Sequence, residues 1–311
     1  MTPTTQTQYK RPSAFVRMFR KYKYLYMMLA FPFAVYIVFR YAPLTGLQVA
    51  FKDYNIFKGM WASPWAGFKY FQEVFGNTKF WLALKNTILL NLWDLIFGFP
   101  APIILAIMLY EMRSVTWKRI AQTILYLPHF LSWIIIGGLV TQLFGSTGMV
   151  NNIIKNLTGN TVNFLMDETN WVIMYVATGI WQSAGWGTII YLAAISGVNT
   201  ELYEAAEVDG CGRLMRIWHV TLPCIMPTII IMLILQLGRM VTIGFERPYV
   251  MANDMVTNVA DVTATFVYTM GIQNARYSFS TAVDIFGSVV NMMFLLAANT
   301  ITKRLGEGGL W

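Results

Sequence analysis

The chain has 311 residues, of which 56% are hydrophobic and only 12% are charged. Soluble globular domains carry about 25% charged residues, so the shortfall indicates long segments in which a charge is too costly to place, as in a membrane protein. The net charge of +8 does not indicate nucleic-acid binding, because the Lys and Arg residues are spread over loop ends and not gathered on one face. Cys211, Cys224, His129 and His219 have neither disulfide-framework nor metal-ligand spacing. We therefore expect no metal site and no nucleic-acid partner.

The N-terminal segment, residues 1–24, contains six Lys and Arg residues and no acidic residue. We expect a basic cytoplasmic arm that ends in a short interfacial helix with Phe15, Val16 and Phe19 facing inward. The first apolar run, 25–42, has no small-residue cleavage site behind it, so it predicts a retained span and not a removed signal peptide. A turn is predicted directly after it, at 43–46.

Five further apolar runs are near or above the roughly 20 residues that cross a bilayer. With the first run they predict an all-α membrane protein with six transmembrane helices in one domain, 25–302, followed by a tail, 303–311. Pro100, Pro102, Pro128 and Pro227 fall inside these runs and predict bent helices, since membrane helices tolerate Pro. The five runs are 82–110, 120–144, 171–195, 224–245 and 280–302.

The distribution of Lys and Arg predicts the orientation of the spans. With the N terminus inside, the cytoplasmic segments hold thirteen of these residues and the distinctly longer outer segments hold nine, while Arg239 remains inside a span. Both termini are therefore predicted to lie in the cytoplasm.

The first predicted outer loop, 43–81, is rich in aromatic residues. An interfacial belt at the headgroups is the interpretation we favour, and a surface for stacking against sugars is the alternative. The aromatic residues are Trp61, Trp65, Tyr70, Phe71, Phe75 and Trp81.

The cytoplasmic loop between the fourth and fifth spans, 199–223, is long, mixed in charge and helical in pattern. Residues 201–207 favour a helix that Asn199 caps, and Gly210 and Gly212 interrupt it before a helical pattern resumes over 213–219. This pattern predicts a helix-turn-helix parallel to the membrane.

One face of the first helix of this loop should suit a protein partner. Leu202, Ala205 and Ala206 share that face at helical spacing, and their small size allows a partner to approach closely. A helix that merely binds headgroups would be basic, whereas this one is acidic. Its acidic residues are Glu201, Glu204, Glu207 and Asp209.

The same loop resembles the EAA loop of binding-protein-dependent ABC importer permeases. Glu204-Ala205-Ala206, Gly210 and 220–223 match its Glu-Ala-Ala, Gly and Ile-x-Leu-Pro elements, with Val220 in place of isoleucine. Other stretches are similar to the oligosaccharide branch of the carbohydrate-uptake permeases, so that the resemblance covers the chain from about residue 20 to its end. These stretches are 21–25, 41–54, Phe80-Trp81, Asn86-Thr87 and 309–311.

The resemblance implies a permease subunit in a bacterial cytoplasmic membrane that works with several partners. These are a second permease, two ATPase subunits that bind ATP and Mg²⁺, an extracellular solute-binding lipoprotein, an oligosaccharide and membrane lipid. The chain has no Gly-x-x-x-x-Gly-Lys-Ser/Thr loop, so we expect it to be non-catalytic and without a cofactor of its own. By matching position, the docking helix would comprise Glu204, Ala205, Ala206 and Gly210, with Leu222 and Pro223 at its base.

Polar residues inside the predicted spans are candidates for a substrate path. Asp284, Ser288 and Asn291 share one face of the sixth span, where a charge costs about 2.5 to 3.5 kcal/mol at mid-bilayer. Asp284 should therefore face a water-lined path or a partner such as Arg239, or else lie at the outer headgroups. Permeases of the resembled family more often have a small apolar residue at this position.

Further polar groups lie on the second, fourth and fifth spans. Each of them could line the path or form hydrogen bonds between helices, and glycines beside the tryptophans should allow close helix approach. The groups are Gln236 with Arg239, Trp181 with Trp186 next to Gly185 and Gly187, and Asn91 with Asp94.

Other functions remain as alternatives. An importer permease for an amino acid or phosphate would have the same cytoplasmic loop. A carrier that works alone should have inverted repeats and paired buried carboxylates, and a membrane-embedded enzyme should have converging acid, base or metal-binding residues. We find neither pattern in the sequence.

Overall fold

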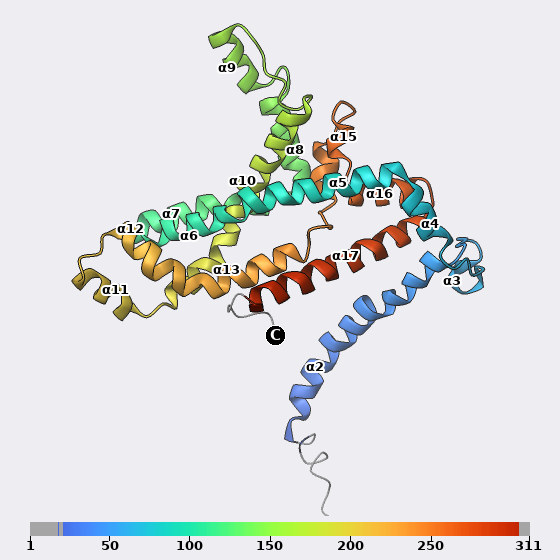
Figure 1. Cartoon of the computed structure of the whole chain (residues 1–311), viewed down its shortest axis with the longest axis horizontal. Coiled ribbons are helices and arrows are strands. Elements are labelled where there is room, and N and C mark those ends of the chain that lie inside the picture. Colours follow the sequence, from blue (N-terminus) through green and yellow to red (C-terminus); the bar gives the residue numbers. More distant parts are fainter. Residues whose placement is uncertain (1–17, 19–20, 305–311) are drawn as a thin grey trace, which may run out of the picture.

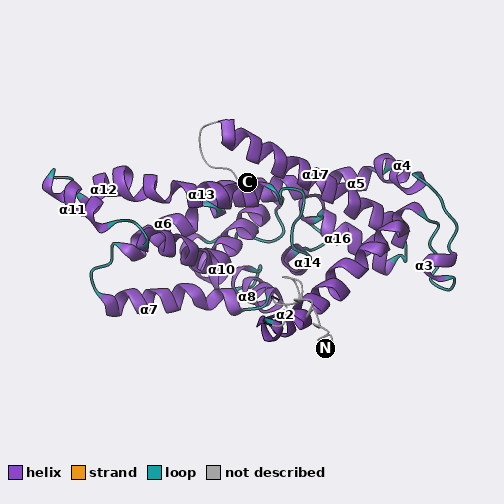
Figure 2. Cartoon of the chain, turned by 90° about the horizontal axis from the view of Figure 1, so that it is seen from below, coloured by secondary structure: helices purple, strands orange, loops and turns teal. Residues whose placement is uncertain are grey.

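The structure is a computed structural model that describes residue 18 and residues 21–304. This part of the chain is helical and contains no strand, only an isolated bridge between Lys52 and Trp65 (Figure 2). The prediction of an all-α protein is therefore confirmed for the described residues. The predicted interfacial helix around 15–19 and the C-terminal 309–311 lie outside them.

The first predicted span lies within a longer helix, Lys23–Phe51. It consists of α2 (Lys23–Tyr36), a π-helical turn η1 (Ile37–Tyr41) and a 3₁₀ helix η2 (Ala42–Phe51). The predicted turn at 43–46 is wrong, because Pro43 occupies the start of η2, where its missing N–H is tolerated. No residue of α2 is buried, and α2 stands apart from the other helices (Figure 1).

The predicted outer loop 43–81 is largely helical. After η2 it forms α3 (Gly59–Ala62) and α4 (Lys69–Gly76), and both η2 and α4 contact the last helix, α17 (Tyr277–Arg304). Asn77 then caps α5 (Thr78–Trp93) by accepting hydrogen bonds from the amides of Lys79 and Phe80. The loop is therefore a folded segment that packs against the start of the last span.

The second span is continuous, and its regular hydrogen bonding changes beside its prolines. A π-helical turn η3 (Asp94–Gly98) joins α5 to α6 (Pro100–Tyr110), and the Phe99 amide donates to the Asp94 carbonyl, one residue farther back than in an α-helix. The wider turn accommodates Pro100, which offers no N–H.

The third predicted span, 120–144, is not one helix. It contains α7 (Val115–Tyr126), a 3₁₀ turn η4 (Leu127–Phe130) that starts near Pro128, and α8 (Trp133–Phe144). The backbone is extended at Leu131, and the Ser132 side chain caps α8, so the helix ends and restarts there. The chain then continues through α9 (Met149–Thr158).

The fourth and sixth spans are long helices, α10 (Glu168–Ser196) and α17. In the described part of the chain, five helices are long and apolar enough to cross a membrane, and α10 is not among them although it has 29 residues. A sixth span therefore remains a prediction. The five are Lys23–Phe51, Thr78–Tyr110, Trp133–Thr158, Arg213–Leu237 and Tyr277–Arg304.

The fifth span ends earlier than predicted and is followed by a folded segment, 238–276, which the sequence analysis treated as a simple outer loop. The spanning helix α13 (Leu222–Leu237) stops at Gly238. The segment after it has several buried residues, among them Val256, Val262 and Phe266, so it is part of the core. Its helices are α14 (Glu246–Met251), α15 (Thr257–Ala260), α16 (Thr263–Tyr268) and the π-helical turn η6 (Thr269–Gln273).

Polar side chains of α5 hold this segment in place. The Asn86 side chain donates to the carbonyls of Asn258 and Asp261 at 2.8 and 2.9 Å, and the Thr263 amide donates to the Thr87 hydroxyl at 2.9 Å. Because Asn86 and Thr87 are themselves buried, these bonds satisfy polar side chains that would otherwise be costly to bury.

Candidate functional site

The predicted coupling loop begins with α11 (Thr200–Val208). The Asn199 side chain accepts from the Glu201 amide, which satisfies one of the free N–H groups at the start of the helix. Gly210 has φ +77°, a left-handed conformation in which a residue with a side chain is strained, and it reverses the chain after α11. The predicted helix and the glycine interruption are both present.

The second helix of the loop differs from the prediction. α12 (Arg213–Arg216) continues through a π-helical turn η5 (Ile217–Thr221) into α13, so it is the beginning of the fifth span and not a separate helix. Leu222 and Pro223 lie in the first turn of α13. The prediction of a helix-turn-helix parallel to the membrane is therefore wrong for its second half.

Few contacts hold α11 to the rest of the chain. The Tyr203 and Thr221 hydroxyls lie 3.0 Å apart, and an Arg216 guanidinium nitrogen lies 3.4 Å from a Glu207 carboxylate oxygen. Partial burial raises the pKa of Tyr203, so this hydroxyl stays protonated and able to donate. Ala206 is buried against the chain itself. These contacts attach one side of α11 to the start of the fifth span.

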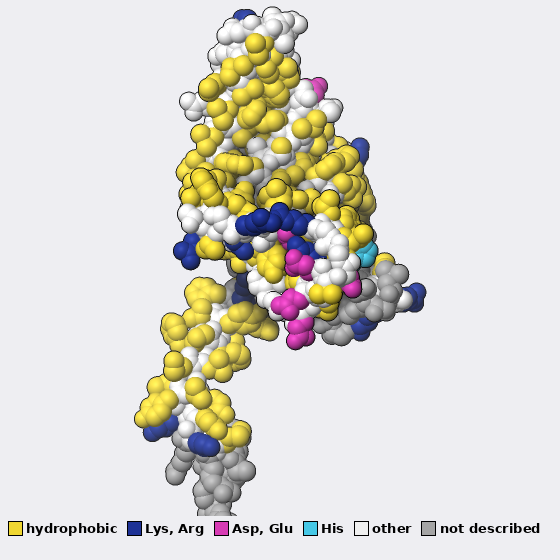
Figure 3. Space-filling model, turned by 90° about the vertical axis from the view of Figure 1, so that its left-hand side faces the viewer, with side chains coloured by type: hydrophobic (Ala, Val, Ile, Leu, Met, Phe, Trp, Pro, Cys, Tyr) yellow, Lys and Arg dark blue, Asp and Glu magenta, His cyan; other side chains and the backbone are white. Residues whose placement is uncertain are grey.

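The other side of α11 is open. Leu202, Glu204, Ala205 and Val208 are exposed, Val208 at 88% of its surface. The predicted face of Leu202, Ala205 and Ala206 is therefore split, because Ala206 faces the protein. Acidic and basic side chains gather on this end of the molecule (Figure 3).

Two of the sixth-span polar residues adjoin a cavity between α5, the 238–276 segment and α17. The cavity has a volume of about 240 Å³ and is lined by twelve residues from α5, the 238–276 segment and α17, including Asp284 and Ser288. Asn291 does not line it. Instead, its side chain accepts from the Val241 amide at 2.9 Å and donates to the Thr242 hydroxyl, so it fixes one wall of the cavity.

Two other predicted groups do not join this cavity. Gln236 lies in the last turn of α13, whereas Arg239 lies beyond the helix end, so they do not share a helix face as predicted. The difference arises because α13 stops at Gly238, well before the predicted end of the apolar run. Arg239 is exposed and forms no ion pair with Asp284 among the described residues.

The fourth-span tryptophans also lie elsewhere. Trp186 stacks on His129 with ring centroids 4.7 Å apart, and Trp181 is half exposed. A Cβ at Gly185 would overlap the Leu125 carbonyl, and one at Gly187 would crowd Pro102. The expectation that these glycines permit close helix approach is confirmed.

Asn91 and Asp94 form interhelical bonds, which was one of their two predicted roles. The Asn91 side chain donates to the Met240 carbonyl at 2.9 Å, and Asp94 forms an ion pair with Arg247 at 2.8 Å. Arg247 also lies over the Tyr175 ring, 3.5 Å from its centroid. The ion pair was not predicted, because Arg247 lies in a predicted outer segment and nothing in the sequence links positions 94 and 247.

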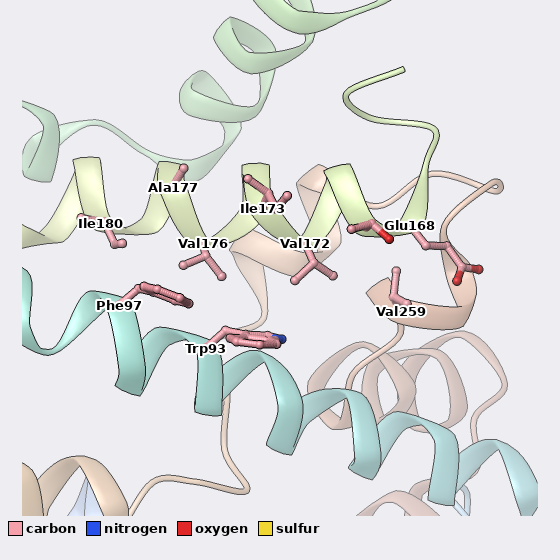
Figure 4. A pocket seen from close by; sticks show the side chains of 10 residues that line it. Trp93, Phe97, Glu168, Val172, Ile173, Val176, Ala177, Ile180 and Val259 are labelled. Carbon is pink, nitrogen blue, oxygen red and sulfur yellow. The ribbon is translucent and has the colours of Figure 1, made fainter. Parts of the chain in front are cut away.

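A larger cavity of about 660 Å³ lies between α10 and the end of α5 (Figure 4). Trp93, Phe97 and Val176 line it with other apolar residues, and Glu168 is its one charged residue. With so few polar groups it offers little to a hydrophilic solute. No group of three potential metal ligands occurs among the residues that the structure describes.

Residues 98–306 match the family of binding-protein-dependent transport system inner membrane components. The chain belongs to this family and is a membrane-embedded transporter component. It is similar to Protein LplB of Bacillus subtilis (strain 168), with 45% identity over 93% of this chain and 91% of the relative.

The names of two further similar proteins include a transported polysaccharide. The polygalacturonan/rhamnogalacturonan transport system permease protein YteP of the same organism is 40% identical over 97% of this chain and 94% of that protein. A chain from the crystal structure of a bacterial ABC transporter involved in the import of the acidic polysaccharide alginate superposes with a TM-score of 0.85 and 39% identity, covering 94% of this chain and 99% of that one.

Proposed function

We propose that this chain is a permease subunit of an ATP-driven oligosaccharide importer, and that α11 couples it to a separate ATPase. The observation that carries the proposal is the geometry of α11. It is a capped helix with an open outer side, and it is attached to the start of a spanning helix by two side-chain contacts. A movement of α11 would therefore be transmitted to the fifth span.

Family membership and the relatives support the transport role. The family's description is binding-protein-dependent transport, which favours a solute-binding protein as a partner. YteP and the alginate transporter are both named for polysaccharides, which favours a sugar over an amino acid or phosphate. We therefore propose an oligosaccharide as the transported solute.

The position of α2 favours a second permease. It is an apolar helix with no buried residue and stands apart from its own bundle, so it is free to pack against another membrane protein (Figure 1). In the proposed mechanism two permeases enclose the path, and ATP-driven closure of the ATPases moves α11 and shifts the path between inward-open and outward-open states. In this proposal the cytoplasmic side is the side of α11, and both termini are assigned to the cytoplasm from the distribution of Lys and Arg.

Charge reversal at Glu204 tests the coupling. In the reconstituted complex, Glu204→Lys should lower ATPase association and solute-stimulated ATP hydrolysis by about tenfold, the effect of about 1.4 kcal/mol at an interface. Asp254→Lys, an exposed charge reversal in the 238–276 segment, should leave ATPase association unchanged. Wild-type association and hydrolysis in Glu204→Lys would contradict the proposal.

A further inference from the structure

The residues that line the cavity beside Asp284 indicate which sugars it can accept. Of its twelve lining residues, Asp284 alone is charged. Three hydroxyls, from Thr242, Thr263 and Ser288, lie on its walls together with the aromatic rings of Phe80 and Phe286. The volume of about 240 Å³ suits a single sugar ring and not a long chain segment.

The Asp284 carboxylate is available to a ligand. It makes no hydrogen bond and no ion pair among the described residues, and it is exposed to the cavity. An ionised carboxylate only accepts hydrogen bonds, with about four lone-pair positions on its two oxygens. It therefore suits a ligand that presents several hydroxyl donors.

Among the described residues that line the cavity, no cation offsets this charge. Arg247, which belongs to the same 238–276 segment, is already paired with Asp94, and Arg239 does not line the cavity. A uronic acid ring placed here would bring a second carboxylate close to Asp284 in a partly dehydrated site, where like charges repel strongly. A neutral ring would instead donate hydroxyl protons to Asp284 and place its apolar face on a phenylalanine.

We infer that Asp284 makes this cavity selective for neutral sugar rings over uronic acids. The inference rests on the proposed oligosaccharide transport and adds a substrate class to it. This class differs from the acidic polysaccharide that the structurally similar alginate transporter imports. Asp284 acts as a specificity-determining residue at the outer part of the path.

Direct binding to the purified permease complex without its solute-binding protein tests the inference, because the binding protein would impose its own selection. Xylotriose serves as the neutral probe and trigalacturonate as the acidic probe, with Kd measured by calorimetry at low salt. The wild type should bind xylotriose at least about tenfold more tightly. Asp284→Asn should reduce this ratio to about threefold or less, and Asp284→Glu should retain it.

Asp254→Asn is the matched control, since it removes an exposed carboxylate outside the cavity. It should leave the ratio of the two Kd values unchanged, and all variants should elute as intact complexes. Equal or tighter binding of trigalacturonate by the wild type, or an equal change for both probes in Asp284→Asn, would overturn the selectivity while leaving sugar transport standing. If neither sugar binds while the complex still imports another solute, both the proposed substrate and the selectivity fail.

Discussion

The ion pair between Asp94 and Arg247 is the best-connected charged group in the described bundle. The two side chains are only 20% and 13% exposed, and Arg247 also donates to the Tyr175 carbonyl. The terminal nitrogens of the buried guanidinium donate to both Asp94 carboxylate oxygens and to a carbonyl, whereas its Nε–H is buried without a partner, so the ion pair offsets most of the cost of burying this charge. The pair joins η3, the bend of the second span, to α14 of the folded segment.

Removing one partner of this pair should be more harmful than removing both. Arg247→Met should lower the free energy of unfolding by about 3 to 5 kcal/mol, because it leaves the Asp94 carboxylate buried without a cation. Asp94→Leu combined with Arg247→Met should recover part of the loss. Thermal unfolding in detergent would measure both, and a double variant less stable than Arg247→Met would contradict this account.

A charge cluster in the folded segment 43–81 predicts a pH effect. Hydrogen bonds from Lys69, at 2.8 Å, and from Tyr70, at 2.6 Å, hold the pKa of Asp53 below its ordinary value of 3.8. A lowered carboxyl pKa stabilises the fold above the ordinary value and ceases to do so as the pH falls through the lowered one.

The fluorescence of the loop tryptophans should therefore be constant from about pH 5 to about pH 8 and change only at more acidic pH. Asp53→Asn should abolish the acid transition that belongs to this cluster. The signals of the other tryptophans should be the same in the variant and in the wild type. An unchanged acid transition in Asp53→Asn would show that the cluster does not hold the loop.

Three helical segments share a local feature, a π-helical turn that ends two residues before a proline. The turns η1, η3 and η5 precede Pro43, Pro100 and Pro223. In each case the residue just before the proline donates to a carbonyl five residues back, and the helix continues past the proline. The wider turn thus accommodates each proline without ending the helix.

Helix approach between α7 and α10 depends on Gly185. Gly185→Ala should destabilise the protein by about 1 to 3 kcal/mol, because its Cβ would overlap the backbone carbonyl of Leu125, which cannot move independently of its helix. Gly138→Ala is the control, since a Cβ there meets nothing within 4 Å. Equal thermal stabilities of the two variants would contradict the predicted packing.

The left-handed glycine after α11 gives a test of the coupling helix. Gly210→Ala places a side chain at φ +77°, which costs about 1 to 2 kcal/mol, whereas Gly212→Ala has φ −69° and should be tolerated. We expect Gly210→Ala to shift α11 and lower solute-stimulated ATP hydrolysis severalfold without a loss of bundle stability. Equal hydrolysis in the two variants would show that the reversal at Gly210 is not needed for coupling.

Sequence patterns predicted helices better than their breaks. Hydrophobic length located the helices that contain the first, second, fourth and sixth predicted spans, and Asn199 with Gly210 marked the limits of α11. The break at Ser132 and the early end of α13 were not predicted, because apolar residues continue across both. Those ends depend on packing and capping, which hydropathy does not report.

The candidate site was predictable only in part, for a related reason. The spacing of Asp284, Ser288 and Asn291 showed that they share a helix face. The opposite wall of the cavity comes from 241–243 and Thr263, which fold back into the bundle through long-range bonds to Asn91 and Thr87 of α5. No local sequence pattern identifies those partners.

At the scale of the whole molecule, α11 lies at one end of the bundle. α4, which contacts the last helix α17, lies toward the other end in two perpendicular views (Figure 1, Figure 2). The central claim is that the end carrying α11 faces the cytoplasm and engages an ATPase, while the cavity at Asp284 opens toward the outer end.

Side-specific labelling of Val208→Cys tests this claim most directly, because Val208 is 88% exposed on α11. The background would carry Cys211→Ser and Cys224→Ser, which remove the native thiols. An impermeant maleimide should fail to label intact cells, should label permeabilised cells that lack the ATPase, and should be blocked when the ATPase is present. Labelling of intact cells from the outside would contradict the account.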